Sequence, residues 1–86
     1  MAFRLVQNQQ VVDERGVWVE SVDRFHVRCR YGECEAVVEV DRASRSYALY
    51  ASSLSLRGGT FPFDPVEAIR DGLLAMGVNQ VEVIQP

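Results

Sequence analysis

The sequence predicts a single α+β domain over residues 1–86, with a mainly antiparallel sheet of five to six strands, one C-terminal helix packed on one face and a final strand. Apolar and polar residues alternate along the first two thirds of the chain, which is the period of a strand with one buried face. A helix start and stop follow, and the alternation then returns. Antiparallel strands followed by a helix are typical of an α+β fold.

The first strand is predicted over residues 3–12, with a turn over residues 13–16. Between Val17 and Tyr31 the odd positions are mostly apolar, and this parity directs Phe25 into the core. Ser21 and Asp23 interrupt the apolar set, so we expect a bend, a bulge or two separate strands there.

Gly32 suits the first central position of a type II′ hairpin turn. The register that this turn sets places opposite charges together on one face and apolar residues together on the other, so two independent requirements agree. The predicted pairs are Arg30–Glu35, His26–Glu39, Arg24–Asp41, Tyr31–Cys34, Cys29–Ala36, Val27–Val38 and Phe25–Val40.

A four-residue turn over residues 42–45 is predicted next, and it sets Tyr47, Leu49 and Ala51 against Val40, Val38 and Ala36. The helix is predicted to begin with Asp64 as N-cap and Pro65 at its first position. Its apolar stripe consists of Val66, Ile69, Leu73 and Met76, and Gly77 suits a left-handed C-cap. Gly72 allows either a close approach to the sheet or no special role. The direction of the last strand, over residues 78–84, stays open.

Composition excludes several function classes. The chain is 48% hydrophobic, carries a net charge of −3, and all nine of its basic residues are arginine. An uncompensated positive stripe is missing, because acidic residues accompany the arginines, so we expect no nucleic-acid partner. No apolar run is long enough to cross a bilayer and no signal peptide is visible, so we expect a cytoplasmic protein that binds no membrane.

His26, Cys29 and Cys34 raise the question of a metal or thiol site. Residues 26 and 29 differ by an odd number, so in a strand their side chains leave on opposite faces. We therefore expect both cysteines to pack in the core, over the alternatives of a redox role or a metal site. No catalytic residue, metal ligand or cofactor follows from this sequence, and a binding protein is expected more than an enzyme.

The sheet face opposite the predicted core is the main functional candidate. Arginine and aromatic side chains are over-represented at interfaces, so we favour a partner interface over an ordinary solvated face. We expect a homodimer or a protein partner. The predicted interface residues are Trp18, Arg28, Arg30, Val37, Ala48 and Tyr50, with Val22 and Leu54 on the same face.

A second hypothesis is a small-molecule binder, or a minor enzyme, with a pocket between the helix start and the sheet. Its predicted lining is Tyr47, Arg57, Phe61 and Phe63.

The C-terminal half, YALYASSLSLRGGTFPFDPVEAIRDGLLAMGVNQVEVIQP, resembles two kinds of small bacterial α+β protein. These are the immunity proteins of polymorphic toxin systems and the products of integron gene cassettes. The resemblance lies in a Tyr-Leu-Tyr strand, a D-P-x-E helix start, a glycine cap and a last strand. It implies a bacterial, non-catalytic accessory or binding protein and carries over no site residues.

Overall fold

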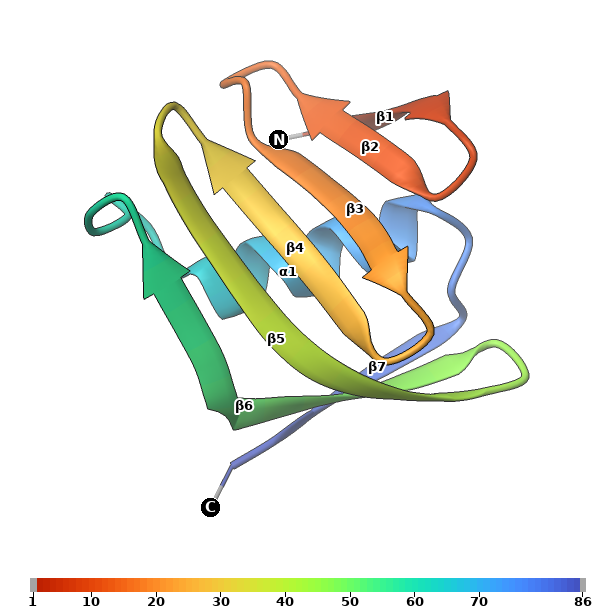
Figure 1. Cartoon of the computed structure of the whole chain (residues 1–86). Helices are drawn as coiled ribbons and strands as arrows, with labels where there is room; N and C mark the ends of the chain where they lie inside the picture. Colours follow the sequence, from red (N-terminus) through yellow and green to blue (C-terminus); the bar gives the residue numbers. More distant parts are fainter. Residues whose placement is uncertain (1, 86) are drawn as a thin grey trace.

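The computed structural model describes residues 2–85, and its strands form one sheet of seven in chain order (Figure 1). Neighbouring strands are antiparallel except β6 and β7, which are parallel and joined by the helix α1. The α+β class and the mainly antiparallel sheet are confirmed. The elements are β1 Phe3–Gln7, β2 Gln10–Asp13, β3 Trp18–Asp23, β4 His26–Tyr31, β5 Cys34–Ala43, β6 Ser46–Arg57, α1 Pro65–Ala75 and β7 Gln80–Ile84.

The expected five to six strands are too few, because the predicted first strand is a hairpin. Gln9 adopts a positive φ of 61° in a turn between β1 and β2, and this turn brings Arg4 opposite Val12. Glutamine is not a residue that usually marks such a turn, so the turn was not predictable from the residue types.

The predicted register of the β4–β5 hairpin is confirmed by the pairs Tyr31–Cys34, Cys29–Ala36, Val27–Val38 and His26–Glu39. The inward position predicted for Phe25 is wrong, since the residue lies in the β3–β4 turn and is 56% exposed. The ladder is irregular between Ser21 and Asp23, and the Phe25 backbone N–H donates to the Asp23 carboxylate at 2.8 Å. This local turn fixes the Phe25 side chain outside the core.

The prediction of a four-residue turn after β5 is also wrong, because Ala43 pairs directly with Ser46 and leaves a turn of two residues. Ser44 has a positive φ of 52°, which a tight hairpin turn requires. The shorter turn moves the register, so that Leu49 lies opposite Val40, and Tyr47 lies opposite Arg42 with the guanidinium 5.1 Å from its ring.

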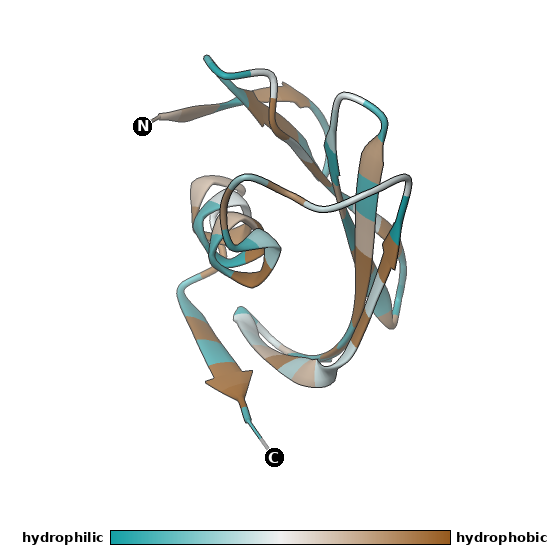
Figure 2. Ribbon diagram, turned by 90° about the vertical axis from the view of Figure 1, so that its left-hand side faces the viewer, coloured by the Kyte–Doolittle hydropathy of each residue, from teal (hydrophilic) through white to brown (hydrophobic). Residues whose placement is uncertain are grey.

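A large bulge then bends β6. The ladder pairs Glu39 with Tyr50 and Val37 with Ser55, so β6 uses more residues than β5 across this point. Ser53 fills the gap, since its hydroxyl accepts from the Glu39 N–H at 2.8 Å and donates to the Tyr50 carbonyl at 2.6 Å. The tip of the β5–β6 hairpin consequently curls beneath the helix (Figure 2).

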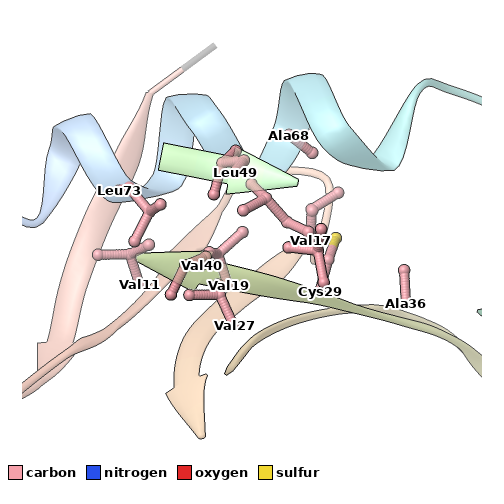
Figure 3. Packing of buried hydrophobic residues seen from close by; sticks show 12 residues of the cluster. Val11, Val17, Val19, Val27, Cys29, Ala36, Val40, Leu49, Ala68 and Leu73 are labelled. Atoms are coloured by element: carbon pink, nitrogen blue, oxygen red, sulfur yellow. The ribbon is translucent and has the colours of Figure 1, made fainter. Parts of the chain in front are cut away.

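The core lies between the concave face of the sheet and α1 (Figure 3). Asp64 caps the helix as predicted by accepting from the Val66 N–H at 2.9 Å, and Gly77 ends it with a φ of 100°. Ile69 and Leu73 are fully buried. The other buried hydrophobic residues are Val11, Val12, Val17, Val19, Val27, Cys29, Ala36, Val38, Val40, Leu49 and Ala68.

The turn between β2 and β3 is held by one buried carboxylate. Asp13 accepts from the backbone N–H groups of Val17 at 3.0 Å and Arg15 at 2.9 Å, and from Arg15 Nε at 2.8 Å. Burial raises the pKa of Asp13, but the hydrogen bonds from Val17 and Arg15 and the charge of Arg15 together lower it below its ordinary value.

None of the helical structure in residues 2–85 combines the length and apolar character that crossing a membrane would require.

Replacing Gly72 by alanine should destabilise the protein. A Cβ at this position would lie 2.6 Å from Val19 Cβ, which is too close for two carbon atoms, so helix and sheet would have to separate. Alanine gains about 1 kcal/mol of helix propensity, and overpacking, which typically costs about 1–3 kcal/mol, should outweigh that gain to leave a net loss of up to roughly 2 kcal/mol in urea unfolding. Adding Val19→Ala removes the two methyl groups that lie 2.8 Å from the new Cβ but keeps the Val19 Cβ, so it should reduce the penalty of Gly72→Ala in part; an unchanged penalty would contradict the contact with the Val19 side chain.

Replacing Asp13 by asparagine should lower the free energy of unfolding at neutral pH by about 1–3 kcal/mol, because the charge is lost and an amide NH2 group replaces the oxygen that accepts from Arg15 Nε. Since the folded pKa of Asp13 is depressed, its ionisation stabilises the protein above its unfolded pKa of about 3.9, and this stability is lost as pH falls through the folded pKa. Urea unfolding from neutral pH to about pH 2.5 should therefore show a smaller acid-induced loss in the variant than in the wild type. Equal losses would contradict this role.

Candidate protein-binding surface

The outer face of the sheet, opposite α1, carries a row of long side chains across its strands. The register aligns Trp18 on β3, Arg30 on β4, Glu35 on β5 and Arg57 on β6. The Arg30 guanidinium carbon lies 5.9 Å from the centre of the Trp18 ring, within the range of a cation–π contact. The row continues on the other side of Trp18 to Val12 and Arg4. We call the part around Trp18 the arginine surface: Arg4, Trp18, Glu20, Arg28, Arg30, Glu35, Val37 and Arg57.

Glu20 fixes two of these arginines. Arg28 donates to one carboxylate oxygen of Glu20 through Nε at 3.0 Å and Nη2 at 2.8 Å, and Arg30 Nε lies 3.2 Å from the same oxygen. Gln10 donates to the other oxygen at 3.0 Å. The register predicted for Arg30 and Glu35 is correct, but the ion pair that Arg30 forms is with Glu20. Glu20 was missed, although it alternates with Trp18 on the same strand.

A second part of the outer face is acidic. The register aligns Asp41, Ala48 and Glu82 across β5, β6 and β7, and Tyr50 lies opposite Glu39. The Tyr50 hydroxyl donates to Asp41. This hydrogen bond raises the pKa of Tyr50, with smaller effects from burial and from the charges of Asp41 and Glu82. We call these five residues the acidic surface.

The acidic surface is hollowed, because short side chains lie between the two carboxylates. The hollow has a volume of about 310 Å³. It is lined by Asp41, Ala43, Ser46, Tyr47, Ala48, Gln80 and Glu82. Glu82 was not among the predicted site residues. The alternation along the last strand indicates only that Glu82 points to the opposite side from Val81 and Val83. Which residues lie beside Glu82 depends on the parallel pairing of β7 with β6, which the sequence left open.

The bend in β6 divides the predicted interface. Trp18, Arg28, Arg30 and Val37 belong to the arginine surface, whereas Ala48 and Tyr50 lie beyond the bulge on the acidic surface. Because the β5–β6 tip curls under the helix, the two surfaces face different directions (Figure 2). Leu54 does not join either surface, since it packs against the core, and Val22 lies 48% exposed near the β3–β4 turn.

The structure separates the residues of the predicted pocket. Tyr47 borders the hollow on the acidic surface, whereas Phe63 borders a second hollow of about 340 Å³ beside the helix start. Phe61 packs edge-on against Phe63 with ring centres 5.4 Å apart, and Arg57 is exposed at the end of β6. The second hollow is lined by Phe3, Arg15, Phe63, Asp64, Glu67, Ala68 and Asp71.

The imidazole and the two thiols do not share a site. His26 lies on the outer face, 2.9 Å from the Asp23 carboxylate, while Cys29 is buried in the core as predicted. Burial raises the pKa of the Cys29 thiol to about 12, with a further contribution from the charge of Asp13. Cys34 differs from the prediction: it is half-buried beneath the loop after β6, with Sγ 3.3 Å from the Thr60 carbonyl oxygen.

Across residues 2–85, no three His, Cys, Asp or Glu side chains gather closely enough to hold a metal ion.

No family model, curated protein sequence or solved structure matches this chain.

The two thiols should differ in reactivity. With a disulfide reagent at pH 8, the Cys34 thiol of the native protein should react first. A pKa of about 12 and complete burial keep the Cys29 thiol protonated and inaccessible. Cys29 should react only after unfolding in urea. In Cys34→Ser the native protein should show no rapid reaction, and a rapid phase in that variant would contradict the position of Cys29.

Proposed function

We propose that this chain is a small non-enzymatic binding protein that contacts a protein partner through the outer face of its sheet. The observation that carries the proposal is Trp18. Its indole lies half-buried on the face that the helix does not cover, and Arg30 stacks beside it. Tryptophan and arginine dominate the binding energy of many interfaces when a partner excludes water from them.

The arginine surface is organised before a partner arrives. Glu20 holds Arg28 and Arg30, and Gln10 holds Glu20 from the neighbouring strand. Side chains that are already ordered lose less entropy on binding than free ones, which favours their use as contacts. Val12, opposite Trp18 in the register, is 5% exposed, so the indole stands over an apolar base.

The resemblance of the C-terminal half to immunity proteins and integron-cassette products suggests the setting. The chain acts in a bacterial cytoplasm, without cofactor or catalytic group, on a toxin-type protein or on another copy of itself. A coding gene next to a toxin gene would support the first partner, and one beside a recombination site would support the cassette origin.

A second candidate function is favoured by the hollow of about 340 Å³ beside the helix start. Its apolar walls are Phe3 and Phe63, and Arg15 stands 4.9 Å from the Phe63 ring, fixed by Asp13. This volume lies at the lower end of small-molecule pockets. A thermal-shift screen that finds a stabilising metabolite, with the effect lost in Phe3→Ala, would favour this function over protein binding.

Trp18→Ala should weaken binding of the partner by about thirtyfold or more, because a central tryptophan typically contributes about 2 kcal/mol or more. The measurement is pull-down from the lysate of the source bacterium, followed by titration of the identified protein. Phe25→Ala is the matched control, since Phe25 is an exposed aromatic residue outside both surfaces. Retention of the partner by Trp18→Ala, or equal loss in both variants, would refute the arginine surface as the binding site.

A further inference from the structure

The outer face separates positive from negative charge. The arginine surface combines four arginines with two glutamates, whereas the acidic surface combines Glu39, Asp41 and Glu82 with no cationic group of its own. The ion pairs of Arg28 and Arg30 both use Glu20, so two guanidinium groups share one carboxylate. The arginine surface is therefore suited to an additional carboxylate.

The acidic surface has a shape that fits such a contact. Its hollow of about 310 Å³ lies between Asp41 and Glu82, with Ala48 as the floor. This volume equals that of roughly ten water molecules at about 30 Å³ each, so it has room for one long side chain. A guanidinium group there would meet carboxylates on two sides and could donate to both in the fork geometry that arginine favours.

From this complementarity we infer that the chain binds a second copy of itself head-to-tail, with the arginine surface of one copy on the acidic surface of the next and Arg30 in the hollow beside Glu82. The inference rests on the proposed function and names the partner. Such a contact gives each surface the group that it lacks. The arginines receive a carboxylate, and Asp41 and Glu82 receive a cation.

Charge and geometry both favour a head-to-tail contact over a symmetric one. A two-fold contact between two arginine surfaces would oppose arginines, and one between two acidic surfaces would oppose carboxylates. The bulge in β6 separates the two surfaces of one chain, and the β5–β6 tip that carries the acidic surface is turned toward the helix (Figure 2). An open assembly of this kind keeps a free arginine surface at one end and a free acidic surface at the other, and growth continues until a ring closes or the concentration limits it.

The test is to disable one surface at a time. Wild-type protein at about 0.5 mM should sediment with an average mass that rises past the dimer; this high concentration populates even a weak contact. Arg30→Glu, with Arg57→Glu as a second variant of the same surface, and Glu82→Arg should each sediment as monomers. Their self-association should fall at least tenfold. Arg70→Glu on the helix and Glu33→Arg in the β4–β5 turn make the same charge changes outside both surfaces and should assemble normally.

Mixing the two disabled proteins gives the decisive result. For this mixture Arg30→Ala and Glu82→Ala are used, because the charge-reversed variants could pair with each other through their altered side chains. Arg30→Ala retains a working acidic surface and Glu82→Ala retains a working arginine surface, so an equimolar mixture should form a one-to-one dimer that grows no further. About 0.5 M NaCl should dissociate it, because the screening length falls to roughly 4 Å. Circular dichroism confirms that each variant is folded.

Monomeric wild type at all concentrations, or a mixture that stays monomeric, would overturn head-to-tail assembly. Because partner capture is measured separately with Trp18→Ala, that outcome leaves the proposed binding function standing, whereas an intact capture by Trp18→Ala would remove the function itself. Assembly beyond the dimer in the mixture would likewise overturn the assignment of these two surfaces.

Discussion

One helix must cover a seven-stranded sheet, and this constraint shapes the whole molecule. A helix of 11 residues is about 16 Å long and about 10 Å wide, whereas seven flat strands spaced about 4.8 Å apart span almost 30 Å. A flat sheet would leave most of its apolar face in water. The sheet therefore curls, and α1 contacts strands from both ends of it, β1 and β2 on one side and β7 on the other (Figure 2).

Two local features make the curl possible. Gly72 lets the helix approach Val19 more closely than any side chain would allow, which brings the helix axis deep into the concave face. The bulge in β6 turns the β5–β6 tip beneath the helix, and Ser53 satisfies the backbone groups that the bulge would otherwise leave unpaired. The connection through α1 then places β7 parallel to the first half of β6, where Val81 and Val83 close the remaining side of the core.

Sequence reasoning succeeded where two requirements acted on the same residues. The β4–β5 register was predictable because only one alignment joins Val27 to Val38 and His26 to Glu39 at once. The helix start was predictable from Asp64 and Pro65, whose roles are local. It failed where a tertiary effect decides between two local options. Ser44 permits either a two-residue or a four-residue turn, and the stacking of Arg42 on Tyr47 belongs to the tighter one.

The same limit explains the candidate site. Parity correctly assigned Trp18, Arg30 and Tyr50 to the outer face, but it says nothing about how that face is bent. On a flat sheet the carboxylates of Glu39 and Asp41 would share a plane with the arginines of β4 and neutralise them, so the face would have little net field. The bulge at Ser53 instead bends β6 between the half that pairs with Asp41 and the half that pairs with Glu35, and so divides one nearly neutral face into two charged ones. The curl that allows a single short helix to bury the core is thus also what gives the outer face two surfaces of opposite charge.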